Sequence, residues 1–495
     1  MTRPFYQSPQ PVPAPSRRLL LLSYHFPPGQ AVGALRWEMM SRYAARRGWG
    51  LDVVTLDPAS LSSRDDHRLT SLPVGIRVFG VPVATFTIER VEQWLLRWRR
   101  RLRSRAVSAP ATTDTPAASP PARPGSLGRT DIPPLPRGPR DLLRAYFAWR
   151  EYARDAAWAR QAAAVALAVY QPGVHRAVIS CGPIHMAHDG ARRVSLATGL
   201  PLVIDLRDPW SLVQRVPEHI ASPVWFRLAA WRERQAVQRA ALTVTNTPAL
   251  CLSMQRLYPR ARDRVITVLN GYDDDPVPPA RHGRRFTIAY AGAVYLDRDP
   301  RPLFRAAARL VRERGLTPET FGVEFMGEVG RFDGLPLEAV AAAEGLPGFV
   351  HIRPAGPRRA ALEFLAAAPL LVSLPQDSDM AIPSKVYEYV KFDAWVLALA
   401  EPGSATAEVL AGTTADVVSP SDEAALYAAL ARRQGQFASG ERPVAIANAG
   451  GGKGAALSRA HQAGLLLDAL DSVVSGSSGD HGLTAPTLTA AGTAF

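Results

Sequence analysis

The sequence predicts an α/β fold built from two consecutive doubly wound domains. Short apolar runs, typical of strands buried on both faces, alternate with longer amphipathic segments through both halves of the chain. A Pro-rich stretch ending near Arg284 separates these halves. The composition, 47% hydrophobic and 21% charged, is that of a globular protein, and 495 residues suffice for more than one core.

The first half contains two strand–helix–strand units. The first has an expected strand at 18–24, a helix over 34–47 that Gly48 ends, and a strand at 51–56. The second extends over 177–204. The pattern then continues with a strand at 242–246, a helix at 248–257 and a strand at 265–269.

The second half repeats the same alternation, which indicates a second parallel sheet. Strands are expected at 286–291, 322–326, 349–353, 370–374, 395–399 and 416–419, and helices at 301–314, 335–344, 358–367, 384–392, 405–410, 423–432 and 455–470. The predicted organisation is a disordered tail at 1–16, a Rossmann-like domain at 17–275 with a disordered insertion at 106–140, a second Rossmann-like domain at 284–433, a connector at 434–454, a helix at 455–471 and a disordered tail at 472–495.

Charge and cysteine content narrow the functional class. The net charge of +14 favours anionic partners such as nucleotide phosphates, anionic lipid or nucleic acid. Cys181 and Cys251 are too few for a disulfide framework or a zinc site, which favours the cytoplasm and predicts that both are buried. No secretory arrangement appears at the start, and no apolar run approaches the ~20 residues of a membrane span.

The segment from Ile382 to Val390 has the pattern of an anion-binding site. It follows an apolar run, and Ser384 is a predicted N-cap of a helix that lies beyond the carboxyl end of a strand, where open α/β sheets bind ligands. Lys385 adds a positive charge for a diphosphate, and Glu388 on the same helix face could hold ribose hydroxyls. The alternative is that Lys385 and Glu388 form an ordinary solvated ion pair.

The loop after the first predicted strand offers a second set of candidates. Gly29 and Gly33 would let the backbone approach a diphosphate, although turn geometry alone explains Gly29 equally well. Arg36 is either an anion contact or a snorkelling surface residue. Arg207 and Asp208 follow another predicted strand and could face a ligand or pair with each other.

Other motifs carry less chemistry. His185 and His188 are too few to bind zinc, and we expect surface or capping roles for them. The glycine-rich run 450–454 lacks the residues of a phosphate loop. No metalloprotease, thiol-redox or serine-hydrolase motif occurs.

Residues 90–105 predict an amphipathic basic helix. Trp94 and Trp98 lie on its apolar stripe, and most of its arginines lie off that stripe. The pattern suits an anionic membrane surface, although such a stripe could also pack against a domain core.

Five motifs together resemble a known family. They are Leu21–Gly29 with Arg36, Pro201–Trp210, Asn270–Asp273, Tyr290–Gly292, and Pro383–Lys385 with Glu388. In this order they resemble the glycosyltransferases of family 4, which have the GT-B fold of two Rossmann-like domains facing across a cleft. The resemblance covers roughly residues 17 to 432.

This resemblance implies a retaining transfer of sugar from a nucleotide diphosphate donor, without a cofactor or an obligatory metal. The acceptor would be a glycan or lipid-linked sugar in cell-surface polysaccharide or glycolipid synthesis, bound by the N-terminal domain. The implied catalytic residues are Lys385, Arg298, Arg207 and Asp208, and the implied donor-binding residues are Gly29, Gly33, Arg36, Gly292, Ser384 and Glu388.

The chain departs from the family pattern at two positions. Met380 stands where the first of two paired glutamates is expected, with Asp377 and Asp379 nearby, and Ala293 stands at an arginine position. Two alternatives therefore stay open: a nucleotide-sugar epimerase or hydrolase on the same fold, and a non-catalytic binding or scaffold protein. No nucleic-acid-reading motif appears. We expect a cytoplasmic protein that could lie on the inner face of the membrane.

Overall fold

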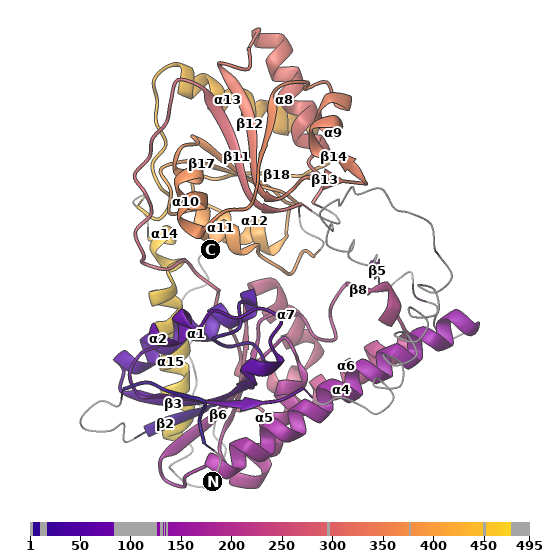
Figure 1. Ribbon diagram of the computed structural model, residues 1–495, viewed down its shortest axis with the longest axis vertical. Helices are drawn as coiled ribbons and strands as arrows, with labels where there is room; N and C mark the ends of the chain where they lie inside the picture. The colour runs from indigo at the N-terminus through magenta and orange to yellow at the C-terminus, as the bar shows by residue number, and fades with distance from the viewer. Residues whose placement is uncertain are drawn as a thin grey trace, which may run out of the picture. The chain divides into compact units, whose positions relative to one another are not determined.

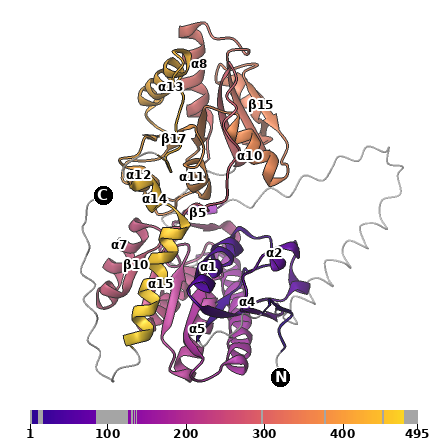
Figure 2. The same ribbon diagram turned by 90° about the vertical axis from the view of Figure 1, so that its left-hand side faces the viewer.

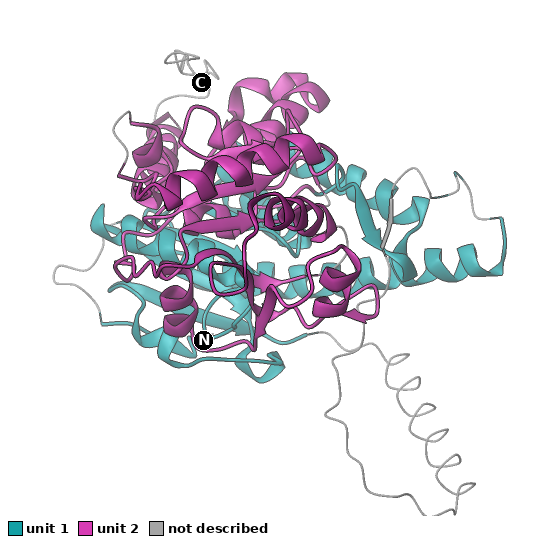
Figure 3. Cartoon of the chain, turned by 90° about the horizontal axis from the view of Figure 1, so that it is seen from above, with its two compact units in different colours: residues 1–206, 210–241 teal, residues 207–209, 242–495 magenta. Residues whose placement is uncertain are grey.

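The computed structural model describes residues 3–9, 17–83, 126–128, 132, 134, 137–294, 298–375, 378–448 and 452–476. The chain forms two compact units, which Figure 3 distinguishes by colour. Unit 1 comprises residues 1–206 and 210–241, and unit 2 comprises residues 207–209 and 242–495.

Unit 1 is built around parallel strands in the order β1-β4-β3-β2-β6-β7, with only β1 antiparallel to its neighbour. Its strands are β1 (Tyr6–Gln7), β2 (Arg17–Ser23), β3 (Trp49–Leu56), β4 (Ile76–Val81), β5 (Ser126–Gly128), β6 (His175–Cys181), β7 (Leu202–Leu206) and β8 (Arg215–Pro217). Its helices are η1 (Val32–Ala34), α1 (Leu35–Arg46), η2 (Pro58–Ser60), α2 (His67–Thr70), α4 (Pro139–Val169), α5 (Met186–Thr198), η4 (Glu218–Ile220) and α6 (Pro223–Arg239).

Unit 2 begins with the parallel pair β9 and β10 and has a separate six-stranded sheet in the order β15-β12-β11-β16-β17-β18. Its strands are β9 (Leu242–Thr245), β10 (Val265–Thr267), β11 (Phe286–Ala293), β12 (Phe321–Glu328), β13 (Arg331–Phe332), β14 (Leu335–Pro336), β15 (Val350–Arg353), β16 (Leu370–Ser373), β17 (Trp395–Leu399) and β18 (Asp416–Val418). Its helices are α7 (Pro248–Leu257), η5 (Pro259–Arg264), α8 (Arg301–Arg314), α9 (Leu337–Ala343), α10 (Arg358–Ala366), α11 (Ser384–Tyr389), α12 (Ala405–Leu410), α13 (Glu423–Ala438), α14 (Lys453–Ala456) and α15 (Arg459–Gly476).

The core of unit 2 lies on both faces of its six-stranded sheet. Along β11, Ile288 and Tyr290 pack with α8, α9 and α13, while Ala289 packs with α10, α11 and α12. This alternation follows from the two-residue period of a strand. Figures 1 and 2 show these helices as two layers around the sheet, so the predicted doubly wound architecture is confirmed.

The strand order defines where a ligand can bind. In unit 2 the order reverses between β11 and its neighbour β16, and both strands are buried and parallel. Loops from such a reversal leave the sheet in opposite directions and open a crevice at the carboxyl ends of the strands. In unit 1 the same reversal lies between β2 and β6.

Several predicted elements need correction. Tyr6–Gln7 forms β1 within the tail predicted as disordered, and Ser126–Gly128 forms β5 within the predicted insertion. The single helix predicted at 455–470 is two helices, α14 and α15, and α15 continues to Gly476 inside the predicted C-terminal tail. The strand at Ile76–Val81 and the helix α6 were not predicted.

Candidate functional site

The end of β11, at the strand-order reversal of unit 2, contains a glycine with an exposed backbone. Gly292 has a φ of 142° and is exposed, and it lies opposite Gly327 of β12, whose φ is 129°. A Cβ atom on Gly327 would lie 2.2 Å from the carbonyl oxygen of Gly292. Glycine is therefore favoured at both positions, and neither residue adds a side chain of its own to this edge of the two strands.

Lys385 points its ammonium at this edge. Its Nζ lies 3.5 Å from the centroid of the Tyr290 ring, and a Cβ atom on Gly292 would lie 2.8 Å from Nζ. The Nζ atom is buried and has no hydrogen-bond partner among the described residues. The ammonium is thus held by the face of one aromatic ring, beside exposed backbone.

Burial and, secondly, the positive charge of Arg298 together lower the pKa of Lys385 to about 6, against the opposing effect of Glu388. Arg298 is half-buried and donates from Nη1 to the carbonyl oxygen of Ala293, at 3.1 Å. Tyr290 Oη donates to the same carbonyl at 2.7 Å. The structure therefore brings Lys385, Arg298 and Gly292 together, and with Tyr290 we call them the Lys385 site.

The helix that carries Lys385 differs from the prediction. Pro383 occupies the N-cap position of α11, and Ser384 is its first residue, exposed and without a side-chain cap hydrogen bond. The prediction of Ser384 as N-cap is wrong, because Pro383 already sets the extended conformation before the helix. The helix ends at Tyr389, whose hydroxyl accepts a hydrogen bond from the Ala291 amide of β11 at 3.1 Å.

Glu388 forms an ion pair with an exposed arginine of α10. Its Oε1 lies 3.0 Å from Nη2 of Arg358, whose side chain is 71% exposed. The alternative interpretation of a solvated Lys385–Glu388 pair is therefore wrong. Glu388 has an exposed partner that a ligand could displace at little cost in stability.

The loop before α11 is anchored by its backbone. Thr247 Oγ1 donates to the carbonyl oxygen of Met380 at 2.8 Å, and the Ala405 amide donates to the carbonyl of Asp379 at 2.7 Å. The Asp379 side chain is exposed, while Asp377 lies outside the described residues. Of the two acids considered as substitutes for the absent glutamate, Asp379 is held in a defined place.

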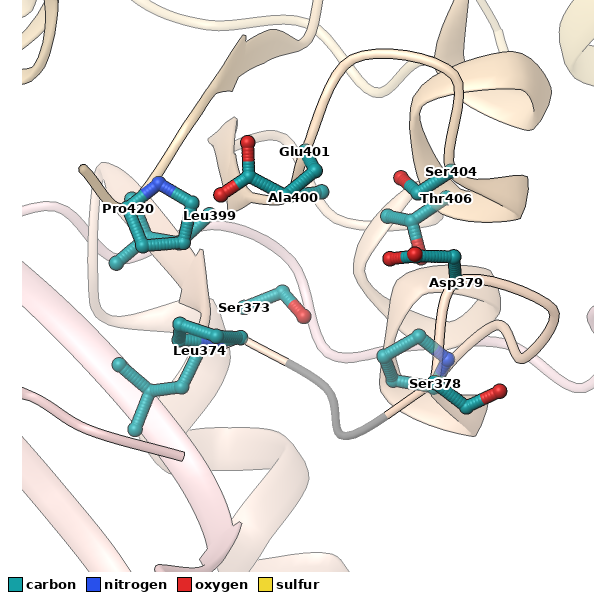
Figure 4. Close-up of a pocket in the computed structure, with 12 residues that line it drawn as sticks. Ser373, Leu374, Ser378, Asp379, Leu399, Ala400, Glu401, Ser404, Thr406 and Pro420 are labelled. Atoms are coloured by element: carbon teal, nitrogen blue, oxygen red, sulfur yellow. The ribbon is translucent and has the colours of Figure 1, made fainter. Parts of the chain in front are cut away.

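A pocket of about 150 Å³ opens beside this loop, at the carboxyl ends of β16 and β17 (Figure 4). Its lining includes Asp379, Pro383, Glu401 and Thr406. The pocket and the Lys385 site share the segment from Asp379 to Lys385, so the same loop shapes both.

The two glycines of unit 1 that were predicted to contact a diphosphate are buried in the segment that follows β2. Gly29 is buried, its amide donates to the Phe26 carbonyl at 3.0 Å, and its carbonyl accepts from Arg68 at 2.6 Å. Gly33 is buried within η1. The turn interpretation explains Gly29, since both of its backbone polar groups are bonded within unit 1.

Arg36 is neither exposed nor snorkelling. It is 3% exposed, and its Nε lies 2.8 Å from Oδ2 of Asp205, which also accepts from Trp37 Nε1 at 2.8 Å. This buried pair joins α1 to β7. Neither predicted role describes Arg36, because its charge is compensated within the fold.

Arg207 and Asp208 lie directly after β7. Arg207 Nη2 is 3.4 Å from Asp208 Oδ2, and their side chains are 15% and 48% exposed. The pairing that the sequence left open as an alternative is present, and Asp208 keeps solvent access.

Surface or capping roles were expected for the two histidines. His185 is half-buried at the N-cap position of α5, without a side-chain capping hydrogen bond, and the surface role is wrong for His188. His188 is fully buried, with Nδ1 2.8 Å from Ser180 Oγ, and burial lowers its pKa to about 3. The His185 ring stacks on Trp210 with centroids 5.3 Å apart. Nearby on α4, burial raises the pKa of Asp155 to about 7. Sequence patterns missed these groups because the contacts that bury them span distant segments.

Other expectations have mixed outcomes. Cys181 and Cys251 are buried, as predicted. In the described part of the chain, no group of three or more His, Cys, Asp or Glu side chains could hold a metal ion. None of the described helices is long and apolar enough to cross a membrane. The amphipathic segment 90–105 lies outside the described residues.

Solved structures with the same architecture are found among sugar-transferring proteins. An α,α-trehalose 6-phosphate synthase from Burkholderia multivorans has a TM-score of 0.54 at 14% identity, over 93% of this chain and 100% of that one. A trehalose-phosphate synthase from Burkholderia xenovorans in complex with glucose-6-phosphate has a TM-score of 0.52 at 12% identity, over 93% and 100%. HepE from Anabaena, in complex with UDP and glucose, has a TM-score of 0.50 at 14% identity, over 92% and 100%.

No family model and no curated protein sequence matches this chain. At identities this low the similarity establishes the fold. The predicted α/β architecture of the GT-B class is therefore confirmed.

Proposed function

We propose that this protein is a glycosyltransferase that takes a sugar from a nucleotide diphosphate donor. One observation carries the proposal: the Lys385 ammonium is buried at the strand-order reversal of unit 2 without a hydrogen-bond partner in the described part of the chain. Charging this buried amine without a partner is costly, as its pKa of about 6 reflects, and anionic ligands that would offset the cost bind at such reversals. The UDP bound to HepE, which has this fold, supports a nucleoside diphosphate as the anion.

The Lys385 site would act on the leaving group. When the bond between sugar and phosphate breaks, negative charge grows on the β-phosphate. Lys385 and Arg298 would neutralise this charge, and the backbone at Gly292 would allow the phosphate to approach closely. Glu388, released from Arg358, would accept hydrogen bonds from the ribose.

The remaining roles rest on the resemblance to family 4. They are retention of configuration, no obligatory metal, and a glycan or lipid-linked acceptor for cell-surface polysaccharide or glycolipid synthesis. Arg207 and Asp208 are proposed near the transferred sugar. Ser384 stays a proposed donor contact because the residue is exposed. Gly29, Gly33 and Arg36 are not proposed as contacts, because all three are buried within unit 1.

A panel of nucleoside diphosphates and their sugar conjugates tests the proposal. A ligand that binds only the native state raises the melting temperature. At a concentration one hundred times its Kd, it adds about 2.7 kcal/mol to the free energy of unfolding. We expect one base to stabilise the protein and the Lys385→Met variant to lose that response. If no member of the panel stabilises the wild type, the proposal fails.

Product analysis separates the alternatives. Turnover of the donor without an acceptor would favour an epimerase or hydrolase. Binding without turnover, in the presence of glycan and lipid-linked acceptors, would favour a scaffold protein. The absent glutamate at Met380 and the absent arginine at Ala293 are the features that keep the scaffold alternative open.

We also propose that the protein binds anionic membrane surfaces. The sequence pattern of residues 90–105 supports this, and so does α4, where Leu142 and Trp149 share one helix face and are 63% and 56% exposed, with Arg140 exposed nearby. Vesicles containing phosphatidylglycerol should bind the protein, and salt should weaken that binding. Equal binding to neutral vesicles, or none, would contradict this part.

A further inference from the structure

The pocket beside the Asp379 loop is lined by two hydroxyl groups that make no hydrogen bond to a described residue. Ser373 is 2% exposed and Thr406 is 4% exposed, and neither hydroxyl makes a hydrogen bond to a described residue. The neighbouring Ser404 differs, because its Oγ accepts a hydrogen bond from the Ala407 amide at 3.2 Å and caps α12. Both residues line the pocket, so their hydroxyls can donate hydrogen bonds to a bound molecule and accept them from it.

The charges around the pocket have one sign. Asp379 and Glu401 line it, and none of its described lining residues is Lys or Arg. In Figure 4 the Asp379 carboxylate is directed toward the interior, beside Thr406, whereas Glu401 turns toward Pro420. Glu401 also accepts a hydrogen bond from Ser419 at 2.8 Å, so Asp379 is the acid with acceptor capacity directed inward.

The size limits the occupant. A single water needs about 10–15 Å³, and pockets for drug-sized ligands span about 300–1,000 Å³. At about 150 Å³ the pocket fits one small polyhydroxylated ring and is too small for a whole nucleotide sugar. Apolar walls at Leu374, Leu399 and Pro420 would cover the carbon face of such a ring.

We propose that this pocket holds the glycosyl group of the donor and selects an uncharged sugar over a hexuronic acid. The inference rests on the proposed function, which puts the diphosphate at Lys385, two residues beyond Pro383 of the pocket lining. Asp379 accepts hydrogen bonds from sugar hydroxyls and repels a sugar carboxylate, because none of the described lining residues is a cation that could compensate either acid. Ser373 and Thr406 supply the remaining hydrogen bonds.

Calorimetric titration with UDP, UDP-glucose and UDP-glucuronic acid tests this selection, with GDP, GDP-mannose and GDP-mannuronic acid as probes if guanosine is the base that binds. The wild type should bind the hexose conjugate at least about tenfold more tightly than the hexuronic acid conjugate. Asp379→Asn should reduce this preference about tenfold without changing diphosphate affinity. Thr406→Val should weaken hexose conjugate binding about fivefold, again with diphosphate affinity unchanged.

Glu408→Gln is the matched control, since Glu408 is exposed on α12 and does not line the pocket. It should leave all three affinities unchanged, and melting temperatures establish that each variant is folded. Equal wild-type binding of both conjugates, or an unchanged preference in Asp379→Asn, overturns the inference while the proposed function stands. Failure of every diphosphate to bind overturns the proposed function and this inference with it.

Discussion

Each unit buries an ionisable group, and the fold stabilises the charged form of only one of the two. In unit 1, Asp52 is fully buried and receives hydrogen bonds from Arg18 and Arg77, with His175 Nε2 at 2.8 Å. In unit 2, the buried Lys385 ammonium contacts the Tyr290 ring and has no hydrogen-bond partner in the described residues. Asp52 joins four strands, since its partners lie on β2, β4 and β6.

The pKa shifts record this difference. Burial alone would raise the pKa of Asp52, but hydrogen bonds from Arg77, His175 and Arg18 outweigh burial and hold the pKa well below its usual range. For Lys385 burial dominates, and the pKa falls to about 6. The fold therefore stabilises the charged form of Asp52. The charged form of Lys385 needs a further partner, such as a bound anion.

The largest expected effect is on turnover in Lys385→Met. Removing a group that stabilises the leaving diphosphate should lower turnover about a hundredfold, equivalent to about 3 kcal/mol of barrier. The ligand-free variant should melt at a higher temperature, because it no longer buries an amine. This gain should be largest below pH about 6, where the folded wild type must carry the charge, and should fade as the pH approaches 10.5, the usual Lys pKa.

Steady-state kinetics and melting curves measure both effects. Lys391→Met is the control, because Lys391 donates to the Asp275 carbonyl at 2.5 Å and is outside the Lys385 site. Its turnover should stay within about twofold of the wild type. Near-normal turnover in Lys385→Met would remove this residue from its proposed role.

Asp52→Asn should produce the largest loss of stability. Breaking a buried ion pair leaves Arg18 and Arg77 without their acceptor charge, which typically costs about 3–5 kcal/mol. Because the folded pKa of Asp52 is depressed, its contribution is present above the usual carboxyl pKa and is lost as the pH falls below it. Denaturant unfolding of the wild type and the variant at pH 7 and pH 3 measures the loss of stability and its dependence on pH.

The control is Asp66→Asn. Asp66 is 62% exposed in a surface pair with Arg64 at 3.5 Å, and its loss should change stability by less than about 1 kcal/mol. Equal effects of the two substitutions would contradict the structural role of the Asp52 network.

A smaller effect is expected for Gly292→Ala. The added Cβ would lie 2.8 Å from Lys385 Nζ at a φ of 142°, so the ammonium must move and the backbone is strained. We expect about tenfold weaker diphosphate binding and a stability loss of about 1–3 kcal/mol. Gly283→Ala is the control, because a Cβ atom added there would have no other atom within 4 Å. Unchanged binding in Gly292→Ala would show that close backbone approach is not required there.

Local patterns predicted the alternation of strands and helices well. The helix at Arg301–Arg314 and the strand at Trp395–Leu399 have the expected bounds, since periodicity and flanking Pro or Gly residues define both. The strand at Ile76–Val81 was missed because it contains Gly80 and is flanked by a glycine and a proline. These residue types are typical of turns.

The candidate site was only partly predictable. The sequence identified Lys385, Arg298 and Gly292, but it could not give their burial or the contact with Tyr290. Arg36 was misassigned because its partner Asp205 lies 169 positions away, and pairing at that distance leaves no local pattern. The pocket-lining hydroxyls of Ser373 and Thr406 were missed because the pocket is formed by separate segments of the chain.

The central claim is that Lys385 becomes charged when a diphosphate binds, and proton uptake on binding tests it most directly. At pH 8 the ligand-free amine is neutral, because its pKa is about 6, and the phosphate is already ionised, with a second pKa near 6. Titrating the diphosphate in two buffers of different ionisation enthalpy should reveal uptake of about one proton by the wild type and none by Lys385→Met. Binding without proton uptake, or equal uptake by the variant, would contradict the claim.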